Sequence, residues 1–264
     1  MKIALCFSGQ IRTLEKCIDT INETIIQKLP NKPDIFCHFS PENSSDEALV
    51  EKLLSPKLCH FEPDEDVEIV NTDLFNECYN KRHEDGLPHS WGPRTKEGVE
   101  QILRQMYSVY MSNELKKQIE EKEQVKYDIV FRMRPDQRYY GTLEDLSLVK
   151  EGEIRVPKHD WHYGINDRFS FAKSDTMDKY AKMYLNIQEL LREKGAFFHP
   201  ETIAWKNCKL NNISILPTNI VCMRVRKDGT VVPLCNYFTD LAKKETISTI
   251  TEKEVLDGKI DNRR

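Results

Sequence analysis

The sequence predicts a single α/β domain whose mixed, mainly parallel sheet is flanked by helices. Between residues 2 and 39, a β-prone run, an amphipathic helical stretch and a second β-prone run follow one another, which is the pattern of a βαβ unit. A second strongly apolar run, residues 127–133, follows a long helical stripe. Neither an internal repeat nor a linker divides the chain. We therefore expect one domain over residues 1–240 and a charged tail over residues 241–264.

Apolar spacing assigns the elements of the amino-terminal half. A strand is expected over residues 2–7, ending at Ser8-Gly9-Gln10, and a helix from Leu14 onward with Thr13 as its N-cap. Further along the chain we expect a strand over residues 34–39, a helix over 46–54, and short strands over 57–61 and 67–70. Residues 76–96 are polar and rich in Lys, Arg, His and Pro, which predicts a surface loop.

The same spacing assigns the carboxyl-terminal half. Residues 99–110 predict an amphipathic helix, and the densely charged residues 113–126 its solvated end. The run 127–133 is the most apolar strand candidate, and Pro135 ends it. We also expect strands over residues 154–156 and 168–172, a helix over 177–191 capped by Ser174 or Asp175, a helix over 200–210, and a hairpin of 221–226 with 230–234.

Composition and charge exclude several classes of protein. The 264 residues are 39% hydrophobic, which is too apolar for a disordered chain, and no run approaches the roughly 20 apolar residues of a membrane-spanning helix. A net charge of −4 gives no indication of a nucleic-acid surface. The eight cysteines form no C-x-x-C pair and several lie in apolar runs, which predicts buried thiols. Reduced thiols without an export signal predict a cytoplasmic protein.

The first candidate site is the junction Phe7-Ser8-Gly9-Gln10-Ile11-Arg12-Thr13 between the first strand and the first helix. Ligands of parallel α/β sheets bind outside the carboxyl ends of the strands. Gly9 lets a ligand approach the backbone, the helix N-terminus offers N–H groups to an anion, and Arg12 can contact a phosphate. A plain turn at Gly9 and a surface Arg12 explain the same residues. The sequence has neither G-x-x-x-x-G-K-[ST] nor G-x-G-x-x-G, which argues against a P-loop or an ordinary dinucleotide site.

The second candidate site is Arg132-Met133-Arg134-Pro135-Asp136-Gln137-Arg138, where three arginines and one aspartate crowd the end of an apolar strand. Alternation places Arg132 and Arg134 on the same side of that strand. Charges at the end of a central strand are costly unless they are paired or face a ligand. Asp136 can therefore ligate a divalent cation, or it can form a structural ion pair with an arginine.

Two polar clusters, residues 159–168 and 198–202, form the third candidate site. Their aromatic, amide, carboxylate and imidazole groups suit sugar recognition, and Asp167 or Glu201 can act as a general base on an acceptor hydroxyl. His159 and His162 are three residues apart, which by itself does not define a metal pair. A helix-capping aspartate, a structural His199 and a solvated loop are the alternative interpretations.

Five stretches of the sequence together match the pattern of one known family. They are residues 3–13, Asp34-Ile35-Phe36-Cys37-His38, residues 127–136, Asn166-Asp167-Arg168-Phe169 and His199-Pro200-Glu201. In this combination the chain resembles a group of sugar transferases encoded by large viruses and by bacterial polysaccharide loci. The matching stretches span most of residues 1–218.

The resemblance implies a single GT-A-like, Rossmann-like nucleotide-binding domain. Such an enzyme takes a nucleotide-sugar donor and transfers the sugar to a hydroxyl of a glycan acceptor. In these folds the first strand and its loop hold the nucleotide, which assigns Ser8, Gly9, Gln10 and Arg12 to the donor.

The resemblance also implies a divalent metal, Mn²⁺ or Mg²⁺, held by an Asp-x-Asp motif at the end of a mid-chain strand. Here that stretch carries one carboxylate, Asp136, which is the metal candidate. Arg132, Arg134 and Arg138 can supply the positive charge for the diphosphate instead, because the leaving group needs positive charge from any source.

Asp167 and Glu201 are the catalytic candidates, since they fall where such enzymes keep acceptor-side or donor-sugar contacts. A nucleotide-sugar-dependent glycosyltransferase is thus the leading hypothesis. A transferase of another activated nucleotide group and a non-catalytic nucleotide- or glycan-binding protein are the alternatives. The donor sugar, the acceptor and the oligomeric state are left open.

Overall fold

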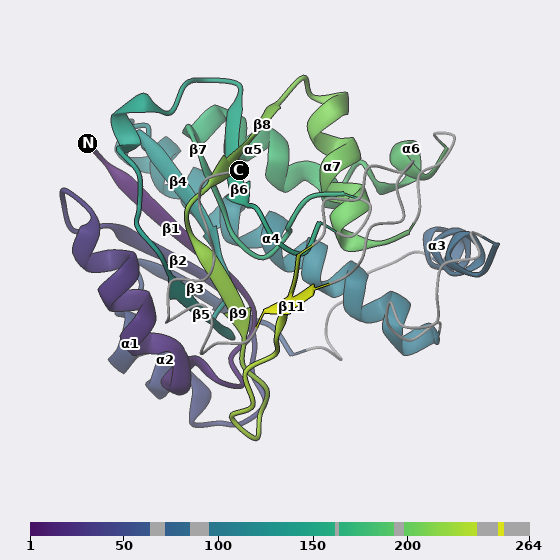
Figure 1. Cartoon of the computed structure of the whole chain (residues 1–264), viewed down its shortest axis with the longest axis horizontal. Coiled ribbons are helices and arrows are strands. Elements are labelled where there is room, and N and C mark those ends of the chain that lie inside the picture. Colours follow the sequence, from purple (N-terminus) through teal and green to yellow (C-terminus); the bar gives the residue numbers. More distant parts are fainter. Residues whose placement is uncertain (64–71, 85–94, 162–163, 193–197, 237–247, 251–264) are drawn as a thin grey trace.

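A computed structural model of the chain describes residues 1–63, 72–84, 95–161, 164–192, 198–236 and 248–250 (Figure 1). Its main feature is a seven-stranded sheet in the order β3-β2-β1-β4-β7-β6-β8. The strands are β1 (Ile3–Gln10), β2 (Asp34–Ser40), β3 (Leu58–Phe61), β4 (Ile129–Met133), β6 (Glu153–Pro157), β7 (Ser170–Ala172) and β8 (Ser214–Thr218). Neighbours are parallel except where β7 pairs antiparallel with β4 and with β6. The predicted mixed, mainly parallel α/β fold is confirmed.

The central strands β1 and β4 are buried on both faces, which explains their continuous apolar runs. The first six residues of β1 and all five residues of β4 are buried. Alternation along β1 sends Leu5 into one core cluster and Cys6 into the other. Leu5 aligns with Ile35 of β2 on one side and with Phe131 of β4 on the other, so the parallel pairing expected of a βαβ unit is confirmed.

Helices cover both faces of the sheet (Figure 1). They are α1 (Leu14–Thr24), α2 (Asp46–Leu54), α3 (Thr72–Glu84), α4 (Lys96–Glu123), α5 (Ser174–Ala181), α6 (Ile187–Arg192) and α7 (Pro200–Leu210), with 3-10 turns η1 (Ile26–Lys28), η3 (Leu146–Leu148) and η4 (Lys182–Tyr184). One core cluster joins α1 and α2 to one face of the sheet. The other cluster joins the helices from α3 through α7 to the opposite face. The long helix α4 contacts β1 and β2. Ser108 of α4 lies at the carboxyl ends of these strands, within hydrogen-bond distance of Gly9 and His38.

Two short ribbons complete the described fold. β5 (Gln137–Tyr140) pairs antiparallel with β9 (Val221–Arg224), and β10 (Leu234–Asn236) with β11 (Ser248–Ile250). The hairpin expected of residues 221–226 with 230–234 forms only in part. A single bridge joins Val225 to Val231, and the strand that pairs with β9 along its length is β5. Apolar spacing does not predict β5, β8, β10 or β11, each at most five residues long.

The prediction of a loop over residues 76–96 is wrong for residues 76–84, which belong to helix α3. Leu74, Phe75 and Tyr79 pack against the core and Cys78 is buried, so a short apolar stripe outweighs the polar composition of this segment. Residues 85–94 of that prediction and the strand predicted over residues 67–70 lie outside the described residues, and Lys96 at its end begins α4.

Two helix predictions also need correction. The stretch 113–126 is solvated only in part, because Leu115, Lys116 and Ile119 are buried while residues 121–124 are exposed. The helix predicted over residues 177–191 is divided into α5, η4 and α6, and Lys173 rather than Ser174 or Asp175 occupies the N-cap position of α5.

The remaining predicted elements are confirmed to within a few residues, and those at 46–54 and 200–210 agree at both ends. Thr13 stands at the N-cap position of α1 as expected, but its hydroxyl donates to the Val225 carbonyl at 3.3 Å instead of capping the helix. No helix among the described residues combines the length and the apolar character needed to cross a membrane.

Candidate functional site

A cavity of about 210 Å³ opens at the carboxyl ends of the parallel strands. The ends of β1 and β2, the residue after β4, one face of α4 and the chain around the end of β9 form its walls. Its lining residues are Gly9, Gln10, Arg12, His38, Ser40, Glu62, Gln101, Arg104, Gln105, Tyr107, Ser108, Arg134, Arg224 and Arg226. This edge of the sheet is where parallel α/β folds bind ligands.

Gly9 and Gln10 bring the end of β1 to the cavity, as predicted. Gly9 has φ +117° and open space where a Cβ would stand, so its backbone is accessible to a ligand and a side chain would be strained. The Gly9 N–H donates to Ser108 Oγ of α4 at 3.0 Å, which ties the strand end to the helix. Ser8, predicted to act with them, is buried and does not line the cavity.

Positive charge dominates the cavity. Five of its lining residues are arginines from four segments of the chain, and Glu62 is the one carboxylate among the described lining residues. Arg12 shares its charge with Glu42, because its Nε donates to Glu42 Oε1 at 3.2 Å. Burial and repulsion from nearby arginines lower the pKa of Arg224 to about 10. Like charges held together in this way favour the binding of an anion.

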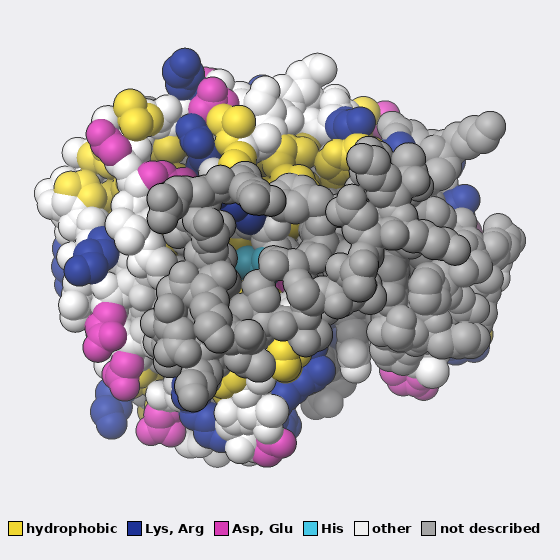
Figure 2. All heavy atoms as spheres, in the orientation of Figure 1, with side chains coloured by type: hydrophobic (Ala, Val, Ile, Leu, Met, Phe, Trp, Pro, Cys, Tyr) yellow, Lys and Arg dark blue, Asp and Glu magenta, His cyan; other side chains and the backbone are white. Residues whose placement is uncertain are grey.

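The positive surface continues beyond the cavity. A neighbouring hollow shares four of the arginines and adds Asp136, Val225, Lys227 and Asp228 to the lining. Figure 2 shows Lys and Arg side chains, in dark blue, gathered toward the lower edge of the face viewed, where the chain of Figure 1 turns after β9. An extended anionic ligand thus has cationic side chains along its path.

Asp136, the metal candidate, is paired with Arg134. Arg134 Nε and Nη2 donate to Asp136 Oδ1 and Oδ2 at 2.8 and 2.7 Å, and Gln137 Nε2 donates to Oδ1 at 3.1 Å. Burial alone would raise the pKa of Asp136, but these partners outweigh it and hold that pKa well below its ordinary value. The pair matches the structural alternative weighed from the sequence. A cation at these oxygens would lie against the guanidinium charge, so the arrangement does not fit a divalent metal.

Arg132 and Arg138, also predicted to contact the donor, do not line the cavity. Arg132 is fully buried, and its Nη1 donates to the carbonyl of Arg168. Arg138 points toward α1, where its Nε donates to the Lys16 carbonyl at 3.3 Å. Of the three arginines in this stretch, the structure thus brings Arg134 to the cavity.

Gln105 connects the cavity to the predicted catalytic carboxylates. Arg134 Nη1 donates to Gln105 Oε1 at 2.9 Å, and Gln105 Nε2 donates to Asp167 Oδ2. Asp167 is buried behind Gln105, beside a void of about 10 Å³ that both residues line. Burial and the charge of nearby Glu201 raise the pKa of Asp167, and the opposing charge of Arg132 limits the effect.

Glu201 lies in the first turn of α7, where Pro200 starts the helix. Its Oε2 is 2.8 Å from Nδ1 of His199, and both side chains are buried. Asp167 and Glu201 therefore lie close enough to influence each other electrostatically. Neither carboxylate lines the main cavity.

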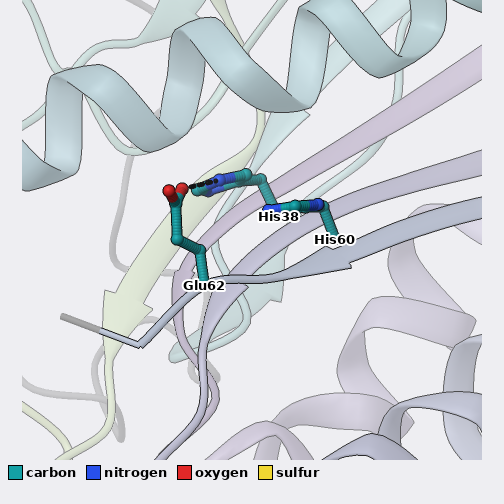
Figure 3. Close-up of side chains that lie close together, drawn as sticks. All are labelled: His38, His60 and Glu62. Atoms are coloured by element: carbon teal, nitrogen blue, oxygen red, sulfur yellow. Dashed lines mark hydrogen bonds and ion pairs between the residues drawn. The ribbon is translucent and has the colours of Figure 1, made fainter. Parts of the chain in front are cut away.

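His38 lines the cavity and has His60 beside it (Figure 3). His38 Nε2 lies 3.0 Å from Glu62 Oε2, and His38 Nδ1 lies 3.1 Å from Ser108 Oγ. The ring of His60 stacks on that of His38 with centroids 5.5 Å apart. Burial lowers the pKa of His38 to about 4, against the opposing effect of Glu62. His38 is therefore neutral at pH 7.

Sequence reasoning missed most of the α4 wall and the β9 arginines. On α4 a local signal was present, since Gln101, Arg104, Gln105 and Ser108 recur at helical spacing and form a polar stripe beside the apolar one. No local signal marks Arg224, because its place at the cavity depends on the pairing of β9 with β5, more than 80 residues earlier along the chain.

The chain belongs to a family defined by a domain of unknown function, DUF7796, whose model matches residues 1–220. No curated protein matches the sequence. Among solved structures, the apo form of mouse xyloside xylosyltransferase 1 is similar, with a TM-score of 0.42 and 11% identity over 82% of this chain and 84% of that chain. Likeness at this level establishes neither a shared activity nor a shared ligand.

Proposed function

We propose that the chain is a glycosyltransferase that transfers a sugar from a nucleotide-sugar donor to a hydroxyl of a glycan acceptor. The observation that carries the proposal is the arginine-lined cavity at the carboxyl ends of the parallel strands. The donor diphosphate binds against Arg134 and Arg224, with Gly9 admitting it close to the backbone and Gln10 and Arg12 at its side. Sugar transfer leaves negative charge on the departing diphosphate, which these arginines stabilise.

In this proposal Asp167 is the general base. Its raised pKa makes it a stronger base than an ordinary aspartate, and Glu201 contributes to that shift. Gln105 stands between Asp167 and the cavity, so the proposal requires this amide to move aside when the substrates bind. The acceptor hydroxyl then gives its proton to Asp167 as its oxygen bonds the sugar carbon, and the diphosphate leaves with the bonding electron pair.

The other predicted residues support the site in this proposal. Asp136 holds the Arg134 guanidinium toward the cavity through its two hydrogen bonds and acts in that way rather than as a metal ligand. Ser8, Arg132 and Arg138 lie behind or beside the cavity lining, and each of the two arginines donates to a backbone carbonyl there.

One observation favours a second candidate, a non-catalytic nucleotide- or glycan-binding protein. Asp167 is buried and its Oδ2 is occupied by Gln105, so the cavity as it stands offers anion binding without an exposed base. The two candidates share the donor site and differ in turnover.

The first test is calorimetric titration of the chain with UDP-, GDP- and TDP-sugars. At least one donor is expected to bind, and Arg224→Ala should weaken that binding about tenfold or more, because one charge-assisted phosphate contact is lost. Arg192→Ala, at an exposed position at the end of α6, is the matched control and should leave the affinity unchanged. Absence of heat with every donor would overturn the proposal.

The second test uses Asp167→Asn with a donor that binds. Turnover or donor hydrolysis should fall by about 100-fold or more while donor affinity stays within a factor of a few, because a general base contributes to the chemical step. A native chain that binds a donor and turns over none with any glycan acceptor would support the binding protein instead.

A further inference from the structure

We propose that His38, His60 and Glu62 form a binding site for a divalent transition-metal ion at the edge of the arginine-lined cavity. The site stands on its own side chains and does not depend on the transferase activity proposed above. Figure 3 shows Glu62 facing His38, with His60 beside His38, and the ligand atoms of the three lie close together.

The sheet itself places the three residues together. β2 and β3 are parallel, and their register sets His38 directly beside His60. Glu62 follows β3 by one residue, and its N–H donates to the Phe39 carbonyl at 2.9 Å, which holds the chain alongside β2. The ligand atoms of the three side chains all lie within 4.8 Å of one another. For these atoms to reach the roughly 2.0–2.2 Å at which imidazole and carboxylate bind a metal such as zinc, the exposed His60 ring turns out of its stack on His38.

The donor set indicates the class of metal. Two imidazole nitrogens and one carboxylate oxygen suit borderline ions such as Zn²⁺ and Co²⁺, whereas Mg²⁺ and Ca²⁺ prefer oxygen ligands throughout. Three protein ligands leave at least one coordination position open, as in catalytic rather than structural zinc sites. His38 is buried, Glu62 is partly buried and His60 is exposed, so an ion can enter from solvent beside His60.

Neighbouring residues of α4 already orient the ligands. Ser108 Oγ lies 3.1 Å from His38 Nδ1, which leaves Nε2 directed toward Glu62. Tyr107 hydrogen-bonds the Glu62 side chain. Outer contacts of this kind fix the ring orientation and the basicity of metal ligands.

The Ser108 hydroxyl also permits the His38 tautomer that leaves Nε2 available to a metal. It has a single proton and lies 2.9 Å from the His38 carbonyl, to which it can donate. When it does so, His38 Nδ1–H donates to Ser108, and the Nε2 lone pair faces the Glu62 carboxylate. A metal cation between these two acceptors satisfies both of them.

The position of the site gives the ion a use. His38 and Glu62 line the same cavity as the arginines, so the open coordination position faces the anion-binding space. An ion there adds positive charge to the wall formed by His38 and Glu62. Asp136, the metal ligand expected from the sequence, is paired with Arg134 instead.

The test is calorimetric titration of the full chain, prepared without a histidine tag and treated with a chelator, with Zn²⁺, Co²⁺ and Mg²⁺. One Zn²⁺ should bind per chain, at least tenfold more tightly than Mg²⁺. His60→Ala and Glu62→Gln should each weaken Zn²⁺ binding at least tenfold, since even outer contacts of a metal site are worth that much. Glu51→Gln is the control, because it makes the same carboxylate-to-amide change at an exposed position of α2. It should leave the Zn²⁺ affinity unchanged.

Visible absorption of Co²⁺ provides a second readout, because the ligand-field bands of nitrogen-bound cobalt should appear with the native chain and be lost in His60→Ala. Zn²⁺ affinity that neither variant changes, in chains whose circular dichroism matches the native one, would overturn the metal site. All titrations are made without a sugar donor, so failure here leaves the donor-binding result untouched, and the reverse holds as well.

Discussion

Lys116 is a fully buried lysine in the second half of α4, and its partners explain how it is tolerated. Its Nζ lies 2.6 Å from Ser174 Oγ, 2.7 Å from Asp178 Oδ1 and 3.1 Å from Glu120 Oε2. A buried charge is costly unless its partners are complete, and here they come from α4 itself and from α5. The charged sequence of this segment therefore builds an internal connection between two helices.

We expect Lys116→Ala to lower the free energy of unfolding by about 3 kcal/mol, because Glu120 and Asp178 would keep buried negative charge without their main partner. Urea denaturation followed by circular dichroism measures the change. Lys117→Ala is the matched control, since this neighbour pairs with Glu114 at the surface and should cost less than about 1 kcal/mol. If the two substitutions lowered the free energy of unfolding equally, the buried cluster around Lys116 would stabilise the protein no more than a surface ion pair does.

At this scale, the sequence predicted the site residues that follow strands directly. Gly9, Arg12 and Arg134 line the cavity because the carboxyl ends of parallel strands meet at one edge. The same rule does not distinguish Arg132 from Arg134. Alternation places both on the same side of the strand, but it does not say which of them is buried. Arg132 ends inside the protein, where it bonds a carbonyl of the following polar cluster.

Among the elements, the start of α7 depends on a glycine of the preceding polar loop. A Cβ at Gly164 would overlap the carbonyl group of Glu201, and the next residue, Ile165, donates its N–H to that same carbonyl at 3.1 Å. The close approach of the two backbones brings Glu201 beside Asp167. The carboxylate pair is thus positioned by contact between a loop and a helix N-terminus.

Gly164→Ala should lower the free energy of unfolding by about 2–3 kcal/mol, because the methyl group forces the loop away from α7. Gly152→Ala is the control, since it meets no atom within 4 Å and adds only the strain of a positive φ of 77°, about 1 kcal/mol. Urea denaturation compares the two. A Gly164→Ala cost no larger than that of Gly152→Ala would contradict the close contact.

Element prediction succeeded where one property dominated a long window and failed where a few residues decided the outcome. The helices at 46–54 and 200–210 have clear starts and apolar spacing, and both ends agree. In α3 a buried Cys78 and its apolar neighbours outweigh a polar composition that resembles a loop. The strands β5 and β9 are stabilised by pairing with each other, so neither segment has a strong strand pattern in its own sequence.

For the whole molecule, we propose that residues 1–240 form the folded domain and residues 241–264 a dispensable tail. Within that tail the structure describes β11, which pairs with β10 through three residues. Among the residues that the structure describes, the seven-stranded sheet and the buried members of both large core clusters all lie at or before position 225. The described part of the tail therefore adds to a small ribbon.

A chain truncated after Asp240 should keep a single cooperative unfolding transition and lose about 1–2 kcal/mol, the contribution of a few strand hydrogen bonds. Thr249→Pro in the full chain should cost a similar amount, because proline removes a donor from β11 alone. Far-ultraviolet circular dichroism and urea denaturation provide the measurement. Loss of the cooperative transition in the truncated chain would show that the tail belongs to the domain.

The order of strands in the sheet also has a consequence for folding. β1 lies between β2, which follows it closely in sequence, and β4, and the contact from the Lys2 N–H to Asp128 joins positions 126 residues apart. Local pairing of β1 with β2 is therefore fast, whereas its pairing with β4 must await closure of a long loop. In that interval one edge of β1 presents an apolar, cysteine-containing strand to solvent and to other chains. The interval before β4 docks is thus the stage of folding at which aggregation competes most strongly with the native sheet.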